Sequence, residues 1–256
     1  MGLIFKQRIT MKKLIIAAIL LASPFFMMAQ TFVSKGKIEF ERKINVHKQW
    51  ESDGGGEWIQ ELKKTVPQYD ITYFDFYFDG NQSTYKPGRE VVSNKPNFFG
   101  QGPASENVVH NDYATQSFTS QKQVFETMYL VQDSLRKIEW KLTNDTRKIA
   151  GFNCRKATGI MMDSVYIFAF YTDEITVTGG PEGFNGLPGM ILGIAIPRMH
   201  TTWFATKLEV VNVTPKDLNT PTKGKKTSVP QLEASLQSSL KDWGKWAQRN
   251  IWLVML

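Results

Sequence analysis

Alternation of apolar and polar residues dominates the body of the chain. Residues 36–46 alternate in this way, and Phe74, Phe76 and Phe78 share one face of a run over 72–78. Because successive side chains of a strand point to opposite faces, a period of two predicts half-buried strands. About nine such runs, separated by short turns, predict a mainly β fold of the β-rich α+β class. We expect an antiparallel curved sheet or half-barrel with a C-terminal helix.

Further local patterns in the body predict additional strands, a short helix and a turn. Residues 58–64 predict a short helix that ends before Pro67. Strands are predicted over 124–131 and 138–142. The run Asn-Asp-Thr-Arg at 144–147 predicts a turn or the start of a helix, because Asn and Asp favour such positions. These signals divide the body into strands joined by short connections.

The start of the chain has the composition of an export signal. Lys12 and Lys13 precede an apolar run over 14–26, and Ala29 precedes Gln30. This order is typical of a secretory signal peptide over 1–29. An uncleaved membrane anchor is the alternative, although the run is shorter than the roughly 20 apolar residues of a membrane span. We therefore predict an exported protein of the periplasm or outer-membrane periphery of a Gram-negative bacterium, with no stable transmembrane span after signal cleavage.

The tail differs from the body in composition. Residues 216–229 are basic and contain Pro and Gly, which predicts a linker. From 230 to 256 apolar residues recur every three to four positions, which predicts an amphipathic helix capped near Ser228. Packing of this helix on the sheet is one interpretation, and contact with a partner or a membrane surface is the other. The predicted organisation places a β-rich domain at 30–215 between the signal peptide and this tail.

The distribution of charge matters more than its total. The chain has 31 Lys and Arg against 24 Asp and Glu, a formal net charge of +7. The predicted leader holds four bases and no acid, residues 30–215 hold 20 bases and 21 acids, and the rest holds 7 bases and 3 acids. A nucleic-acid binder concentrates basic residues on one face of its fold. The nearly neutral body therefore predicts no nucleic-acid partner.

A segment rich in glycine and proline carries the clearest motif. Residues 179–194 hold six glycines and two prolines that interrupt an apolar run. Such a pattern predicts a turn-rich crossing into a buried strand, with Pro188-Gly189 at the centre of a type II turn. The hexapeptide at 186–191 resembles the signature of the GLPGLI family, secreted proteins of Bacteroidetes-type bacteria. The residues that carry the resemblance are Gly180, Pro181, Phe184, Gly186, Leu187, Pro188, Gly189, Met190 and Ile191.

This resemblance implies a location and a fold more than an activity. It extends to the flanking segments 140–158 and 170–175. It implies an exported protein without an established biochemical activity, and a curved sheet similar to that of periplasmic lipoprotein carriers. It also implies an accessory role beside a TonB-dependent transporter of the outer membrane. Fold analogy by itself does not carry function.

The residues that usually carry chemistry are sparse. His47, His110 and His200 lack the spacing of metal ligands, and one cysteine excludes an intramolecular disulfide or a Cys-based metal cluster. Cys154 lies in an alternating strand, where we expect a buried and inert thiol. The sequence therefore predicts no metal, no cofactor and no catalytic residue.

Five residues remain as candidates for ligand binding. Phe74, Phe76 and Phe78 would line an apolar site, although such a stripe is more often ordinary core. Asp173 and Glu174 lie beside the glycine-rich segment and supply charge. The favoured hypothesis is a non-enzymatic binding or accessory protein for an apolar or peptide-like ligand, or for an outer-membrane transport partner. The alternatives are a structural module of the cell envelope and an unrecognised hydrolase that uses Asp173, Glu174 or His200.

Overall fold

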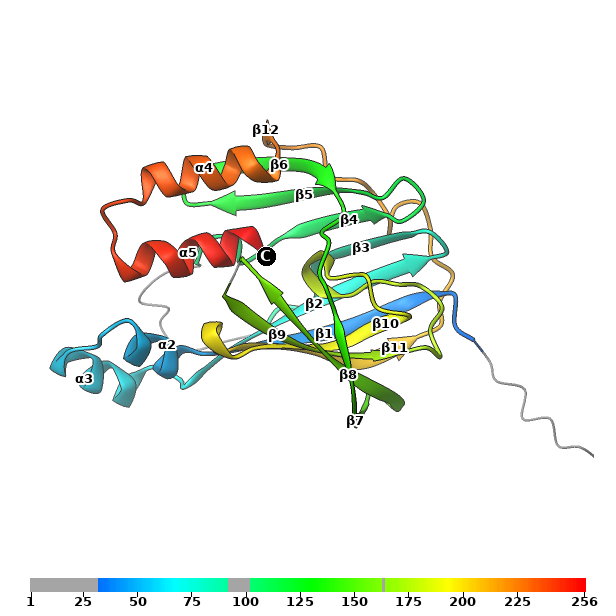
Figure 1. Ribbon diagram of the computed structural model, residues 1–256, viewed down its shortest axis with the longest axis horizontal. Coiled ribbons are helices and arrows are strands. Elements are labelled where there is room, and N and C mark those ends of the chain that lie inside the picture. Colours follow the sequence, from blue (N-terminus) through cyan, green and yellow to red (C-terminus); the bar gives the residue numbers. More distant parts are fainter. Residues whose placement is uncertain (1–31, 92–101, 163) are drawn as a thin grey trace, which may run out of the picture. The chain divides into compact units, whose positions relative to one another are not determined.

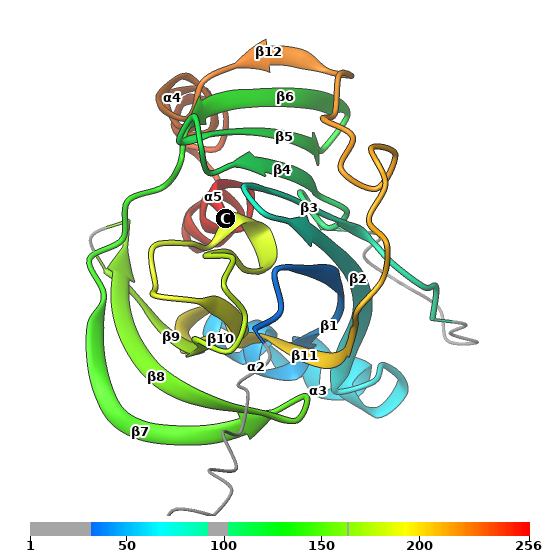
Figure 2. The same cartoon turned by 90° about the vertical axis from the view of Figure 1, so that its right-hand side faces the viewer.

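One curved sheet of twelve strands organises the protein (Figures 1 and 2). The computed structural model describes residues 32–91, 102–162 and 164–256, so the predicted signal peptide lies outside the described residues. The strands lie in the order β12-β6-β5-β4-β3-β2-β1-β11-β10-β9-β8-β7. Their bounds are β1 Lys35–Asn45, β2 Tyr69–Asp79, β3 Gln82–Pro87, β4 Val108–Asp112, β5 Ser117–Val124, β6 Thr127–Ser134, β7 Lys141–Ile149, β8 Phe152–Met161, β9 Val165–Thr172, β10 Met190–Ile196, β11 Thr201–Glu209 and β12 Lys225–Thr227.

Neighbouring strands in this sheet are antiparallel, apart from β12, which pairs with β6 in parallel. The sheet turns back on itself, so that one face is concave (Figure 2). The predicted class, a mainly β protein with a curved antiparallel sheet and helix at the C-terminal end, is therefore confirmed.

The concave face holds the core. Ile38 and Phe40 of β1 lie against β2, in register with Phe76 and Phe74, and all four side chains are buried. Each large apolar side chain removed from water contributes roughly 1.5–3 kcal/mol. The alternation that predicted strands thus reflects one face turned to this core and the other turned to water.

In the described parts of the chain, four α-helices and two short 3-10 helices accompany the sheet. Their bounds are α2 Val46–Ser52, α3 Glu57–Thr65, α4 Val229–Ser239, α5 Lys245–Met255, η1 Pro181–Gly183 and η2 Pro197–Met199. Ser228 and Gln231 form a capping box at the start of α4, which satisfies amide groups that no helical carbonyl reaches. Gly244 separates α4 from α5 with a φ of 55°, a backbone conformation that favours glycine. Helix α5 lies inside the curve of the sheet (Figure 2).

The two tail helices pack against the strands at one end of the sheet. Leu232 and Leu236 of α4 and Val254 of α5 form a second buried cluster with Val124 and Val131 of β5 and β6. Within the described part of the chain, no helix is long and apolar enough to cross a membrane. The predicted boundaries of the domain, the linker and the tail stay predictions.

The middle of the chain differs from its sequence prediction. No strand covers 138–140, and the segment 144–147, predicted as a turn or a helix start, lies inside β7. A register shift between Leu142 and Thr146 lets this polar run stay in the sheet. The predicted strand over 124–131 is also interrupted, because a hairpin turn at Phe125 and Glu126 separates β5 from β6.

The glycine-rich segment forms the connection between β9 and β10. Phe184, Leu187, Met190 and Ile191 are buried in the core. Gly189 has a φ of +135°, and a Cβ atom there would lie 2.0 Å from the carbonyl oxygen of Thr172. This close approach explains the glycine, as the sequence pattern predicted.

Candidate functional site

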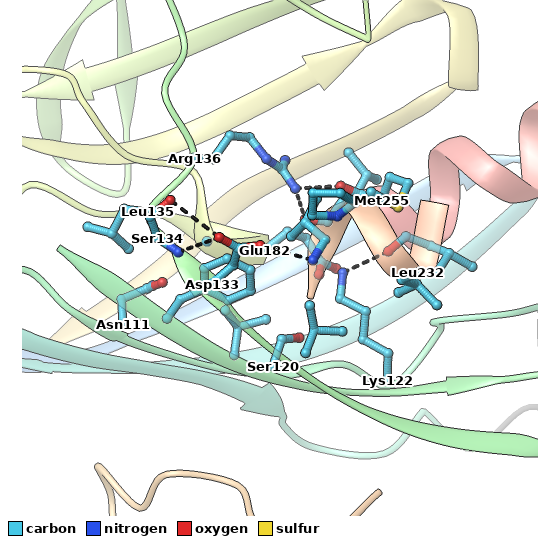
Figure 3. A pocket seen from close by; sticks show the side chains of 18 of the residues that line it. Asn111, Ser120, Lys122, Asp133, Ser134, Leu135, Arg136, Glu182, Leu232 and Met255 are labelled. Atoms are coloured by element: carbon cyan, nitrogen blue, oxygen red, sulfur yellow. Dashed lines mark hydrogen bonds between the residues drawn. The ribbon is translucent and has the colours of Figure 1, made fainter. Parts of the chain in front are cut away.

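A pocket of about 290 Å³ opens between the concave face of the sheet and the tail helices (Figure 3). Strands β4, β5 and β6 form its floor, and η1, the start of α4 and the end of α5 form its walls. Ser134 and Lys137 at its rim are exposed to solvent, whereas Asn111 and Ser120 on the floor are buried. This volume is near the lower end of the range for small-molecule sites.

Glu182 is the buried acid of this pocket. It lies in η1 with a φ of 52°, which is uncommon outside glycine, and its side chain is 3% exposed. Asn107 Nδ2 donates a hydrogen bond of 2.9 Å to Oε2, and the Tyr85 hydroxyl donates one of 3.3 Å to Oε1. Burial, together with the negative charge of Glu182, raises the pKa of Tyr85 well above its ordinary value. The carboxylate is therefore held by two donors that keep their protons.

Two cations face the same space, one of them buried and the other partly buried. Lys122 of β5 donates from Nζ to the Val254 carbonyl oxygen at 2.9 Å. Arg136 donates to the carbonyl oxygen of Leu256 at 2.8 Å and also to that of Met255. These carbonyl groups end helix α5, where the helix dipole favours positive charge. Figure 3 shows both side chains directed into the pocket with Glu182.

Burial disfavours the charged form of both cations. It lowers the pKa of Lys122 from 10.5 to about 8, although the charge of Glu182 acts in the opposite direction. It lowers the pKa of Arg136 to about 10, again against Glu182. Both groups therefore remain cationic at neutral pH in a water-poor site, where their electrostatic effect is stronger than in water.

The floor also presents polar atoms without partners. Asn111 Oδ1 and Ser120 Oγ are buried, and neither atom has a hydrogen-bond partner within the described structure. Asp133, at the edge of the pocket, is instead used by the fold, because it accepts a hydrogen bond of 3.0 Å from the Val229 amide at the start of α4.

This arrangement suits a reaction in which a proton moves and negative charge develops. A fixed carboxylate can accept a proton from water and return it to a leaving group. Fixed cations stabilise an oxyanion as it forms. No group of three or more His, Cys, Asp or Glu side chains that could hold a metal ion occurs among the described residues.

The residues predicted for ligand binding lie elsewhere. Phe74, Phe76 and Phe78 are packed in the core and do not line this pocket. Asp173 forms a 2.9 Å ion pair with Arg155, and both side chains are more than half exposed. Glu174 Oε1 accepts a hydrogen bond of 3.4 Å from the amide of Asn153. Their roles as ligand contacts stay predictions.

The side chains of the predicted hydrolase do not meet. His200 contacts Ser52 through Nε2 at 2.8 Å, in an environment that contains neither Asp173 nor Glu174 among its described partners. Cys154 is buried, and burial raises its pKa to about 12, so the thiol is inert as predicted.

The comparisons with known proteins identify the family. Residues 99–232, more than half of the 256 residues, match the family described as "N-glycanase peptide, N-terminal domain". The chain belongs to this family. Two solved structures of PNGF-II, in space groups P21 and C2, share its fold, with TM-scores of 0.52 and 0.50. Sequence identity to them is 14% and 15%, and 79% and 85% of this chain is covered. No curated protein matches the chain significantly.

The chain spans about a third of the length of the PNGF-II structures, 33% and 32%. At 14% and 15% sequence identity, the similarity to the PNGF-II structures shows the fold of this chain. The pocket residues Asn111, Ser120, Lys122 and Glu182 lie within the segment that matches the family, as does Asn107, which donates to Glu182.

Family membership corrects three expectations from the sequence. The assignment to the GLPGLI family is wrong, because the matching family is that of the N-glycanase N-terminal domain. The favoured interpretation as a non-enzymatic binding or accessory protein is wrong for the same reason, and the hydrolase alternative fits better. The expectation that the protein is not an enzyme is likewise contradicted, since the family is named for an enzyme. The glycine-rich hexapeptide forms a turn that leads into a buried strand. Proteins of different families can share such a turn.

Proposed function

We propose that this chain acts in N-glycan processing as a hydrolase of the N-glycanase type, with the pocket at Glu182 as its substrate site. One observation carries the proposal. In a chain of this family, a buried carboxylate shares a pocket with the buried cation Lys122 and the partly buried cation Arg136. Perturbed titratable groups gathered in a cleft favour a functional site.

The chemistry follows from the positions of these groups. An N-glycanase is an amidase, so the bond that breaks joins an amide nitrogen to a carbonyl carbon. Glu182 would accept a proton from a water molecule while the water oxygen attacks that carbon. The carbonyl oxygen gains negative charge next to the cations. Glu182 then returns the proton to the leaving nitrogen, which yields a carboxylic acid and a sugar amine.

The contributions expected from each group are substantial. Positioned acid–base catalysis typically accelerates a reaction by about 10²–10⁴-fold. Removal of one oxyanion-stabilising donor typically costs about 10²–10³-fold. The neutral variant Glu182→Gln keeps the shape of the side chain and removes the base. It therefore separates the contribution of acid–base catalysis from that of substrate binding.

The chain corresponds to about a third of PNGF-II, so the activity of that whole protein is carried over only as part of this proposal. The test is glycan release from a short N-glycopeptide by the purified full chain, followed by mass spectrometry. We expect release by the unmodified protein and at least a 100-fold slower rate for Glu182→Gln. The matched control is Glu139→Gln, because Glu139 is exposed and lies outside the pocket. Absence of release by the unmodified protein, or equal rates for Glu182→Gln, would overturn the proposal.

A further inference from the structure

We propose that Asn111 and Ser120 on the pocket floor bind a secondary amide group of the substrate. This inference rests on the proposed function and names the chemical group that the same pocket recognises. The group is either the acetamido substituent of an amino sugar or an amide of the peptide that carries the glycan. The experiment below distinguishes these two sources.

The first observation is that two buried polar atoms of the floor have no hydrogen-bond partner among the described residues. Asn111 is 1% exposed, and its Nδ2 donates to Ser83 Oγ at 3.3 Å, while its Oδ1 has no partner. Ser120 is fully buried, and its Oγ has no partner. Buried polar atoms are nearly always paired in native proteins, and leaving them unpaired costs stability. The two other described atoms of this kind belong to Asn107 and Trp203, which do not line the pocket.

The second observation is the spacing of these two residues. Val109 lies opposite Ser120 and Asn111 lies opposite Phe118, so Asn111 and Ser120 are diagonal neighbours on one face of β4 and β5. The Cα atoms of diagonal neighbours in an antiparallel pair lie about 7–8 Å apart. In a trans amide, N–H and C=O point in opposite directions, so with bonds of ~2.9 Å their two partner atoms lie about 8 Å apart. The backbone spacing of these two residues is therefore close to the span of one amide.

The polarity of the floor agrees with this span. Asn111 Oδ1 is an acceptor for the amide N–H, and the Ser120 hydroxyl is a donor to the amide oxygen. Lys122, two residues beyond Ser120 on the same face of β5, adds a charged donor beside that oxygen. Val109, Val131 and Phe118 provide apolar surface next to these groups, which suits the methyl of an acetamido substituent.

Other small groups fit less well. A carboxylate would place negative charge against the acceptor Asn111 Oδ1. A single hydroxyl donates and accepts at one oxygen, so its two partners lie within about 6 Å of each other, which is less than the spacing of the floor. A secondary amide supplies the donor, the acceptor and the distance together.

The test measures binding of small probes to the full chain by isothermal titration calorimetry. The probes are N-acetylglucosamine, glucose and a short peptide with blocked ends. We expect N-acetylglucosamine or the blocked peptide to bind at least 10-fold more tightly than glucose. The tighter of the two identifies the source of the amide. Equal binding of glucose and both amide probes would overturn the inference.

Variants locate the binding on the floor. Ser120→Ala removes the donor, and Asn111→Leu removes the acceptor at similar volume, so each should weaken binding of the amide probe at least 10-fold. Thr119→Ala is the control, because Thr119 precedes Ser120 on β5 and does not line the pocket. Unchanged affinity in Ser120→Ala would overturn the inference whatever the glycan-release assay shows. Probe binding that depends on Ser120, without any glycan release, would leave the inference standing and reject the proposed function.

Discussion

Asn107 donates a 2.9 Å hydrogen bond from Nδ2 to Oε2 of Glu182, a residue 75 positions further along the chain. Both side chains are buried, at 1% and 3% exposure. The bond joins the segment before β4 to the η1 turn between β9 and β10. It fixes the carboxylate on which the proposed chemistry depends, because a carboxylate accepts charge-assisted bonds that are stronger than neutral ones.

Replacing Asn107 with Ala should weaken both stability and activity. Among the described residues, the Glu182 carboxylate then keeps only the longer bond from Tyr85, so the free energy of unfolding should fall by about 1–3 kcal/mol. Urea denaturation at pH 7 measures this loss. Asn144→Ala is the control, because Asn144 is exposed on β7. A stability for Asn107→Ala equal to that of the control would show that the bond does not hold the acid in place.

Removing the Ser120 hydroxyl should stabilise the protein without ligand. The buried Oγ has no partner, and truncation to Ala relieves the cost of burying it, which is about 1 kcal/mol. Thermal denaturation of the unliganded chain checks this, and we expect a Tm at or above that of the unmodified protein. A clear fall in Tm would mean that the Ser120 hydroxyl is paired within the fold and is therefore not free to bind a substrate.

Lys122 should make stability depend on pH in the alkaline range. Its pKa is about 8 in the folded protein and 10.5 without burial, so between these values the unfolded chain binds a proton that the folded chain has lost. The free energy of unfolding contributed by Lys122 therefore rises with pH across this window, by roughly 3 kcal/mol in total. Below pH 8 the lysine is charged in both states, and the full cost of its burial is present.

The variant Lys122→Met isolates this effect from other titrating groups. Its advantage over the unmodified protein should be largest below pH 8 and should shrink toward pH 10.5. Urea denaturation of both proteins across this range gives the difference, and Lys148→Met on the exposed face of β7 serves as control. A difference that is constant with pH would contradict the assignment of the effect to Lys122.

Gly189 should tolerate no side chain. An added Cβ atom would lie 2.0 Å from the Thr172 carbonyl oxygen at a φ of +135°, so Gly189→Ala should cost at least about 3 kcal/mol. Gly80 has a φ of +54° with no atom within 4 Å of the added carbon, so Gly80→Ala should cost only about 1 kcal/mol. Chemical denaturation of the two variants separates the steric clash from backbone strain. Similar losses in both would rule out the close approach at Gly189.

Much of the fold was predictable because local pattern and burial agree in the central strands. In β1 and β2, alternating Ile38, Phe40, Phe74 and Phe76 face the core, and the polar residues between them face water. The start of α4 was predictable for a similar reason, since Ser228 and Gln231 cap the helix through contacts three residues apart.

The errors in the fold have a physical cause. Strand β7 lies at one edge of the sheet and is exposed along nearly all its length. A strand with two solvated faces needs no alternation, so its polar residues at 144–147 resemble a turn. Helix α2 follows β1 without a break, capped by Asn45, and the apolar Val46 continued the strand pattern across the boundary.

The site was not predictable because its contacts are distant in sequence. Lys122 meets Val254 across 132 residues, and Arg136 meets Leu256 across 120. One signal was available: Glu182 is the only acid between Ile175 and Ile196, in a segment otherwise apolar or rich in glycine. A charged residue retained in such a segment indicates a specific environment, since buried acids are rare unless they are paired.

The most direct test of the proposed hydrolysis is the fate of the water oxygen. The full chain is incubated with an N-glycopeptide in heavy-oxygen water, and the peptide product is sequenced by mass spectrometry. If Glu182 activates the attacking water, the glycosylated asparagine of the substrate becomes an aspartate with one heavy oxygen atom. The variant Glu182→Gln should then abolish this product. A glycopeptide that stays intact, or an aspartate formed equally by Glu182→Gln, would contradict the assignment of N-glycan hydrolysis to this pocket.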